Sequence, residues 1–334
     1  MKDEIVSAIR SAETALLLLH DNPDGDTIGS GLALYAILSR MGKRAILCCN
    51  DPIPKTYRFL PGWDQIRKPA PERARHDLAI FIDCSDPDRA PQCLESLAPH
   101  GKVLNIDHHG TNTAYGDINW VDPRAAAVGQ MIFHLIAALD MTPTPDEALC
   151  LYASIVSDTG SFRFDNTTPE AHEIAAALLR TGMDAGLVRE RLFENRERGD
   201  IRLLALALRT MEITRDGSIA VMSVTRDIWE EARAEDQAME GLVNYARSIA
   251  GVKIALLLRE VEDNKVKVGF RARGNYDVGA LAAQFGGGGH PGAAGALLEG
   301  PLAEVKARVM EAAGSLLGCS DTSLVSLWDS TLEE

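Results

Sequence analysis

Two short stretches of the chain gather the histidines and aspartates best suited to metal chemistry. The first is the HDNPDGD segment at residues 20–26, and the second is Asp107-His108-His109. Each follows an apolar run, Ala15–Leu19 or Val103–Ile106, of the kind that forms a buried strand. Carboxylates gathered at the rim of a sheet repel one another unless a cation holds them. The pattern therefore predicts a metal site, for more than one ion, at the edge where open α/β sheets keep their active sites.

Two more aspartates extend this set. Asp83 ends the apolar run Leu78–Ile82, which favours it over the other acids of its loop, and Asp158 follows a predicted helix. Simpler interpretations exist: Asp26 precedes a helix and suits an N-cap, and Asp158 suits a helix-end turn. Because His20 and the Asp107–His109 cluster accompany these acids, we favour the metal interpretation.

The elements that position these residues alternate between strand and helix in the N-terminal half. This alternation predicts an α/β fold with a mainly parallel sheet and helices on both faces. A helix that begins after Thr168, with Pro169 at its first position, closes this half. The expected strands are Ala15–Leu19, Arg44–Cys48, Leu78–Ile82 and Val103–Ile106, and the expected helices are Glu4–Ala12, Thr27–Met41, Ala125–Leu139 and Asp146–Val156.

The C-terminal half has a different pattern, which predicts a smaller α+β domain. Two hairpins, Ile213–Val224 and Lys253–Arg271, precede a helix over Asp277–Phe285. The glycine run that starts at Gly286 and ends in Gly288-Gly289-His290 is predicted to be a loop whose amides line a phosphate pocket, with a flexible link as the alternative. We expect a catalytic domain over 1–186, a helical linker over 187–210, this second domain over 211–319 and an acidic tail over 320–334.

Composition narrows the possible partners. The 334 residues are 46% hydrophobic and 25% charged, which fits two soluble globular domains. A net charge of −14 excludes coating of long duplex nucleic acid but allows an anionic substrate if bound cations reverse the local field. The six cysteines lack zinc-ribbon spacing, and we find no signal peptide and no membrane-spanning segment. We expect a cytoplasmic protein with reduced thiols, and a homodimer stays open.

The order of these motifs resembles a known family. The pattern His-x-x-Pro-Asp-Gly-Asp-x-Ile-Gly-Ser from His20, the strand-end Asp83, Asp107-His108-His109 and Asp158-Thr-Gly-x-Phe-Arg163 resemble the four motifs of the DHH phosphoesterase superfamily. The glycine run with His290 and Ala293-Ala294-Gly295 resembles the phosphate-binding signature of the domain that accompanies DHH domains. The two-domain layout is similar to the nanoRNase and pAp (3′-phosphoadenosine 5′-phosphate) phosphatase group.

The resemblance implies a two-metal site. One Mn²⁺ is held by His20, Asp24 and Asp83, and Asp83 bridges to a second ion, whose other ligands would be Asp26, His108 and Asp158. The catalytic residues would be His109 and Asp107. His109 would contact the phosphoryl group, and Asp107 would support the site by contacting groups around the metal ligands or through the metal-bound water. Ligation by nitrogen and oxygen without thiolate agrees with Mn²⁺, with Mg²⁺ or Co²⁺ as alternatives.

The implied activity is hydrolysis of short nucleotides by metal-activated attack of water on phosphorus. The enzyme would cut very short oligoribonucleotides, remove the 3′-phosphate of pAp, or both. Candidate substrate-binding residues are Arg163, Arg271, Arg273, Gly288, Gly289 and His290, and the resemblance favours Arg271 among the arginines of the second domain. Alternatives are hydrolysis of linear or cyclic dinucleotides, pyrophosphate or polyphosphate, and a nucleotide-binding regulator without catalysis.

Overall fold

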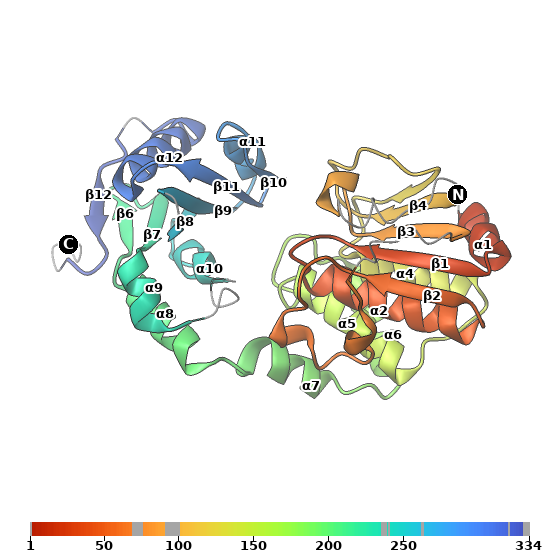
Figure 1. The fold of residues 1–334 in the computed structure, drawn as a ribbon. Helices are drawn as coiled ribbons and strands as arrows, with labels where there is room; N and C mark the ends of the chain where they lie inside the picture. Colours follow the sequence, from red (N-terminus) through yellow and green to blue (C-terminus); the bar gives the residue numbers. More distant parts are fainter. Residues whose placement is uncertain are drawn as a thin grey trace. The chain divides into compact units, whose positions relative to one another are not determined.

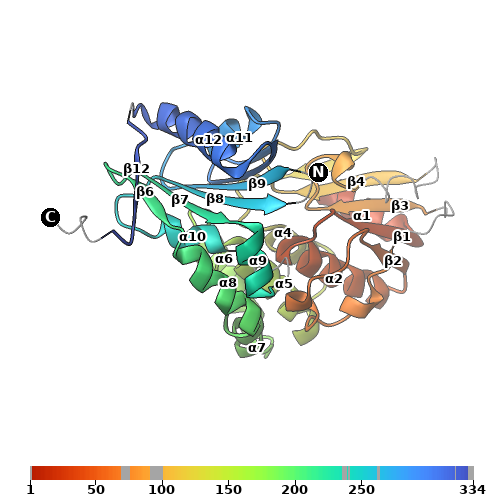
Figure 2. The same cartoon turned by 60° about the vertical axis from the view of Figure 1, so that its left-hand side comes forward.

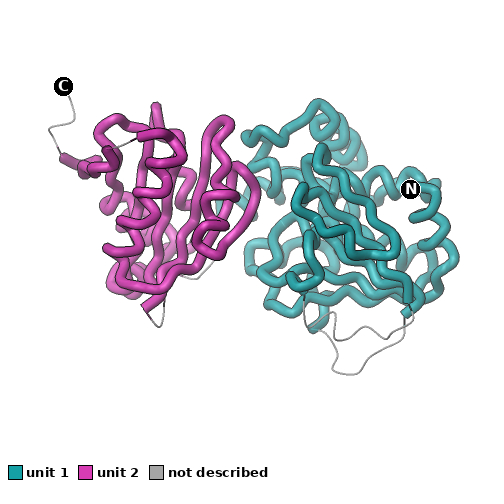
Figure 3. The backbone as a smooth tube through the Cα atoms, turned by 90° about the horizontal axis from the view of Figure 1, so that it is seen from above, with its two compact units in different colours: residues 1–195 teal, residues 196–334 magenta. Residues whose placement is uncertain are grey.

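The structure, a computed structural model, describes residues 2–68, 76–90, 101–234, 239, 241–261, 264–319 and 321–329. The chain divides into two compact units, residues 1–195 and residues 196–334 (Figure 3). Each unit has its own sheet and its own apolar core.

Unit 1 is built on a five-stranded sheet in the order β2-β1-β3-β4-β5. Every neighbouring pair is parallel, as the sequence predicts. Leu19 lies beside Ile82, and Ile82 beside Ile106, so these three strands end level with one another. The fifth strand was not expected. The strands are β1 (Thr14–Leu19), β2 (Arg44–Cys48), β3 (Leu78–Ile82), β4 (Lys102–Asp107) and β5 (Ile118–Val121).

Helices cover one face of this sheet, where α2, α4 and α5 pack against each other and against the strands (Figure 1). On the other face, among the described residues, Leu16, Leu18 and Phe81 pack with Cys84, Ala90 and Tyr115. The helices are α1 (Lys2–Ser11), α2 (Gly25–Arg40), α4 (Val128–Ala138), α5 (Pro145–Asp158), α6 (Pro169–Leu179) and α7 (Ala185–Arg189), with 3-10 turns at Lys55–Tyr57, Trp63–Gln65 and Pro87–Arg89 and a π-helix at Glu190–Glu194.

Helix starts in unit 1 follow local capping rules. Thr168 caps α6 by accepting a hydrogen bond from the Ala171 amide, with Pro169 at the first position as predicted. Thr144 and Glu147 form a capping box at the start of α5. Helix α5 is thereby fixed at its start, and Asp158 is its last residue.

Unit 2 is a mixed seven-stranded sheet in the order β10-β11-β9-β8-β7-β6-β12. The two predicted hairpins are confirmed as the antiparallel pairs β6–β7 and β8–β9, while β7 and β8 run parallel. Two helices, α11 and α12, cover one face, and α8 and α10 cover the other (Figure 2). The strands are β6 (Glu212–Thr214), β7 (Ile219–Val224), β8 (Ile254–Val261), β9 (Lys265–Ala272), β10 (Gly288–His290), β11 (Ala293–Glu299) and β12 (Leu324–Ser326), and the helices are α8 (Arg198–Leu208), α9 (Arg226–Ala232), α10 (Leu242–Arg247), α11 (Val278–Ala283) and α12 (Leu302–Leu317).

Two segments of unit 2 differ from expectation. Gly288–His290 is an edge strand paired with β11 rather than a loop. A Cβ at Gly289 would lie 2.5 Å from the Ala293 carbonyl oxygen, so the glycine lets the two strands approach closely. Near the C-terminus, β12 pairs with β6, and the Trp328 indole donates to the Leu208 carbonyl. None of the helices in the described ranges is long and apolar enough to cross a membrane.

Candidate metal centre

The carboxyl ends of β1, β3 and β4 lie level with one another and bring residues 20–26 close to Asp107-His108-His109. His20 directly follows β1, Asp83 directly follows β3, and Asp107 is the last residue of β4. The start of α2 supplies Asp24 and Asp26, and the end of α5 supplies Asp158. The N-cap of α2 is Asp24, whose Oδ1 accepts from the amides of Asp26 and Thr27 at 3.0 and 3.1 Å. The N-cap interpretation considered for Asp26 is therefore wrong.

The six predicted metal ligands form two groups, each with donor atoms within 4.8 Å of one another: His20, Asp24 and Asp83, and Asp26, His108 and Asp158. A third such group, Asp83, His108 and His109, shares one residue with each of them and includes the predicted catalytic histidine. Asp83 links the two groups, because its Oδ2 lies 3.4 Å from His20 Nε2 and its Oδ1 3.6 Å from His108 Nε2. This arrangement has the donors and the shared carboxylate that a pair of neighbouring cations requires.

The orientation of the two histidines fits a cation. His20 Nδ1 lies 2.8 Å from the Asp21 carbonyl oxygen, and His108 Nδ1 lies 3.0 Å from that of Ala125. A carbonyl only accepts, so in both rings Nδ1 carries the hydrogen and Nε2 points at carboxylates. Among the residues that the structure describes, His20 Nε2 and Asp83 Oδ1 are buried without a hydrogen-bond partner. A divalent cation in each of the two groups would satisfy these atoms.

The protonation of the cluster leads to the same conclusion. Burial raises the pKa of Asp83 well above its usual value, and the charges of Asp26 and Asp24 raise it further. Burial also raises the pKa of Asp158, to about 8. For His108 burial lowers the pKa, but Asp158, Asp26 and Asp83 outweigh it and raise the value to about 10. Without bound cations, the cluster therefore retains protons at neutral pH.

Asp26 has a second task that the sequence did not reveal. Its carboxylate accepts from the amides of Val128 and Gly129 at 2.8 and 3.2 Å and from the Ser154 hydroxyl at 2.6 Å. These amides begin α4, whose N-cap residue, Ala127, provides no side-chain hydrogen bond. Asp26 thus caps a neighbouring helix from α2, which fixes the direction of its carboxylate.

The predicted catalytic pair, Asp107 and His109, is in hydrogen-bonding contact. Asp107 Oδ1 lies 2.7 Å from His109 Nδ1 and also accepts from the His108 amide. Burial opposes ionisation of Asp107, but the hydrogen bond and charge of His109 lower its pKa below the usual value. An ionised carboxylate only accepts, so His109 Nδ1 carries the hydrogen of this contact.

The segment after Asp158 forms a tight turn that places Arg163. Gly160, Ser161 and Phe162 all have positive φ, and the exposed Arg163 donates from Nε to the Gly160 carbonyl at 2.6 Å. Asn166, which the sequence did not single out, donates to both the carbonyl and Oδ2 of Asp158. Its only signal was its position three residues after the motif that runs from Asp158 to Arg163.

In unit 2, His290, Ala293 and Arg271 lie in one row across β10, β11 and β9. The next row on the same face consists of glycines, Gly288, Gly295 and Gly269. Within these rows, only the methyl group of Ala293 lies between the imidazole and the guanidinium. Gly289 lies between the two rows in β10, with its φ at +145°. Arg273 follows the end of β9, where its amide donates to the Lys253 carbonyl.

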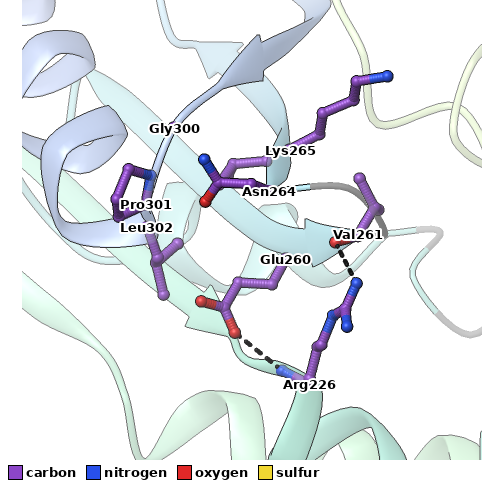
Figure 4. Close-up of a pocket in the computed structure, with 9 residues that line it drawn as sticks. Arg226, Glu260, Val261, Asn264, Lys265, Gly300, Pro301 and Leu302 are labelled. Atoms are coloured by element: carbon purple, nitrogen blue, oxygen red, sulfur yellow. Dashed lines mark hydrogen bonds between the residues drawn. The ribbon is translucent and has the colours of Figure 1, made fainter.

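A separate cavity of about 630 Å³ lies in unit 2, near the turn between β8 and β9 and the start of α12 (Figure 4). Arg226 spans its wall, donating from its amide to Glu260 and from its guanidinium to the Val261 carbonyl. None of the predicted site residues lines this cavity.

Comparison with known proteins agrees with the motif order. Residues 14–155 match the DHH family, N-terminal domain, and residues 216–318 match the DHHA1 domain. The chain is 37% identical over 294 residues to the bifunctional oligoribonuclease and PAP phosphatase NrnA of Thermus thermophilus, covering 88% of this chain and 87% of that protein. It is 29% identical to the NrnA protein of Bacillus subtilis, covering 89% of this chain and 93% of that protein.

The fold also matches a solved structure. The crystal structure of an exopolyphosphatase-related protein from Bacteroides fragilis aligns with a TM-score of 0.86 at 24% identity, covering 95% of each chain. One conclusion follows from the similar sequences, the shared fold and the clustered motif residues. The chain belongs to the DHH phosphoesterase family and is a metal-dependent phosphoester hydrolase.

Proposed function

We propose that this enzyme hydrolyses short nucleotides, either very short oligoribonucleotides, pAp, or both, with two Mn²⁺ ions. The observation that carries the proposal is that the Asp83 carboxylate faces both groups of nitrogen and oxygen donors, with one oxygen near His20 and the other near His108. The similarity to proteins named as oligoribonuclease and PAP phosphatase supports this substrate class.

Two sets of residues would hold the ions. His20, Asp24 and Asp83 suit one site, while Asp83, with the Asp26, His108 and Asp158 group, suits the other. Mixed imidazole and carboxylate donors favour Mn²⁺, with Mg²⁺ and Co²⁺ as alternatives. When bound, the two ions activate water and neutralise charge on the phosphoryl group.

The residues of the chain orient the substrate around that centre. Asp107 holds the His109 ring through Nδ1 and so fixes its orientation. We assign His109 Nε2 to the phosphoryl oxygens, to which it donates when Nε2 also carries a hydrogen. The exposed Arg163 guanidinium follows Asp158 in sequence, and we assign it to a substrate phosphate.

Unit 2 would recognise the rest of the nucleotide. Arg271 and His290 are separated by Ala293 alone, so both can contact one phosphate or sugar. We assign Arg273 and the backbone of Gly288 and Gly289 to the same substrate. The neighbouring row of Gly288, Gly295 and Gly269 has no side chains of its own, so we assign its backbone as a surface for a planar base.

Substrate assays test the proposal. The purified chain with Mn²⁺ is given dinucleotides, pAp, a long oligonucleotide, a cyclic dinucleotide and pyrophosphate, and products are separated by ion-exchange chromatography. We expect turnover of dinucleotides or pAp and none of the long oligonucleotide. Turnover of the cyclic dinucleotide or pyrophosphate alone would support another substrate class, and binding of pAp without hydrolysis would support a regulator.

Variants separate the two tasks. Asp83→Ala should abolish turnover and weaken binding of both ions, whereas His290→Ala should spare metal content and raise KM. Asp88→Asn is the matched control, since Asp88 is an exposed acid of the same loop outside the donor groups. Near-normal activity of Asp83→Ala would disprove the shared-ligand assignment.

A further inference from the structure

A polar network lies behind the metal centre, on the sheet face opposite α2, α4 and α5. Its focus is the carbonyl oxygen of Cys84, the residue after Asp83. This oxygen accepts from Asn105 Nδ2 at 3.0 Å, from the Tyr115 hydroxyl at 3.0 Å and from Asn112 Nδ2 at 3.3 Å. Three side-chain donors on one carbonyl hold the peptide between Cys84 and Ser85, one residue beyond Asp83, in a single orientation.

Asn112 connects this carbonyl to the predicted catalytic pair. The same Nδ2 lies 2.5 Å from Asp107 Oδ2 and 2.8 Å from Asn105 Oδ1. Its own Oδ1 accepts from the Ala114 amide at 2.7 Å, which fixes the amide so that the NH₂ group points at Asp107. One side chain therefore contacts the segment that carries Asp83 and the carboxylate that orients His109.

Both contacts matter because the Asp83 backbone and the Asp107 carboxylate could each adopt another conformation. Asp83 has φ +58°, a left-handed conformation that aspartate tolerates but does not prefer. If the Cys84 carbonyl lost these donors, the backbone of Asp83 could relax and its carboxylate would turn away from His20 and His108. Asp107 could likewise rotate without the Asn112 donor, and His109 would lose its fixed tautomer.

We propose that Asn112 is a positioning residue that locks the Asp83 turn and the Asp107–His109 pair to each other, with Asn105 and Tyr115 completing the lock. The assignment of Asp83 as a shared metal ligand and of His109 as a phosphoryl contact rests on the proposed function. The geometric claim, that Asn112 fixes the Asp83 backbone and the His109 ring, stands apart from it.

Asn112→Asp is the most selective test. The aspartate keeps an oxygen for the Ala114 amide but places its second oxygen, in place of the NH₂ group, against Asp107. Asn119→Asp is the matched control, because Asn119 also sits in this region, yet its hydrogen bonds only close its own turn with Gly116. Tyr115→Phe is a milder variant that removes the hydroxyl and retains the ring packed on Phe81.

Three measurements follow: Mn²⁺ affinity by electron paramagnetic resonance, kcat and KM on bis(p-nitrophenyl) phosphate, and the metal-free crystal structure of each variant. We expect Asn112→Asp to lower Mn²⁺ affinity and kcat by about 10- to 100-fold with KM within about twofold. Tyr115→Phe should lower both by about two- to tenfold, the effect of one hydrogen bond. Asn119→Asp should leave both unchanged.

Each outcome decides the proposal. Equal effects of Asn112→Asp and Asn119→Asp, or an Asn112→Asp enzyme with wild-type affinity and kcat, overturn it. If Asn112→Asp does not fold, an unaltered Tyr115→Phe enzyme overturns it. If the wild-type chain neither binds Mn²⁺ nor cleaves the ester, the proposed function fails, and the crystal structures alone decide. Asp83 still at φ +58° with His109 still 2.7 Å from Asp107 in Asn112→Asp then refutes the lock.

Discussion

Replacing Asp83 by asparagine should abolish the metal response of the protein while leaving its metal-free fold intact. Asparagine keeps the shape of the protonated carboxyl and tolerates the left-handed backbone at this position. Burial and the charges of Asp26 and Asp24 raise the pKa of Asp83 well above its usual value, so ionisation of this carboxyl is unfavourable without cations. The substitution therefore removes a metal ligand and a carboxyl whose charged form the metal-free fold disfavours.

The expected magnitudes differ clearly. One ion at a hundredfold excess over its Kd stabilises a folded protein by about 2.7 kcal/mol. In a unit of 195 residues this corresponds to a rise in Tm of about 5–11 °C. The wild-type chain should show at least this rise with Mn²⁺, and Asp83→Asn should show almost none. In EDTA the two proteins should agree within about 1 kcal/mol.

Differential scanning calorimetry of metal-free and Mn²⁺-loaded samples at pH 7 measures both quantities, and Asp88→Asn serves as the matched control. A variant that retains the full Mn²⁺ shift would refute the role of Asp83 as a shared ligand. A variant that loses more than about 2 kcal/mol in EDTA would refute the conclusion that the carboxyl contributes little to folding.

Two further predictions concern the same cluster, and a third concerns the glycine row of unit 2. The metal-free fold should lose stability as pH rises from about 4 to 10. The pKa values of Asp158 and His108 are raised in the folded state, so over this range the folded chain holds protons that the unfolded chain has released. Each of the two groups can contribute up to about 1.4 kcal/mol per pH unit. With saturating Mn²⁺ this trend should weaken or reverse, since cations need unprotonated ligands, and Tm measured from pH 5 to 9 in EDTA and in Mn²⁺ checks both signs. Asp26→Ala should destabilise even the metal-free chain by about 3–5 kcal/mol in urea unfolding, because two amides of α4 and Ser154 lose their buried acceptor, and a change below about 1 kcal/mol would contradict the capping role. Gly295→Val should raise KM for a dinucleotide at least tenfold without altering Mn²⁺ affinity, by covering the middle of the glycine row, and an unchanged KM would exclude that row from substrate binding.

Much of the fold could be predicted because its strongest elements carry their own local signals. The strands Arg44–Cys48 and Leu78–Ile82 appear with the predicted bounds, and the start of α6 follows its Thr-Pro cap. The short strands β5, β10 and β12 could not be predicted this way. A glycine segment such as β10 has no intrinsic strand preference, so it becomes a strand only because β11 offers a partner.

The same distinction separates the site residues that could be predicted from those that could not. The six metal candidates were identified because acids and histidines directly after apolar runs are costly to bury and stand out. Ser154, Asn112 and Asn166 were missed because polar residues in helices and loops are ordinary in sequence. Their importance lies in partners far along the chain, such as Asp26, 128 residues from Ser154.

The sequence by itself determined which side chains gather at the candidate metal centre, since strand ends and side-chain chemistry are local properties. Only the tertiary structure decided how they act together. The level ends of parallel strands make Asp83 common to both donor groups, and backbone carbonyls choose the tautomers of His20 and His108. The structure also gives the N-cap of α2 to Asp24 and leaves Asp26 for α4. These outcomes depend on strand register and on a left-handed residue after β3, which arise only when distant segments pack together.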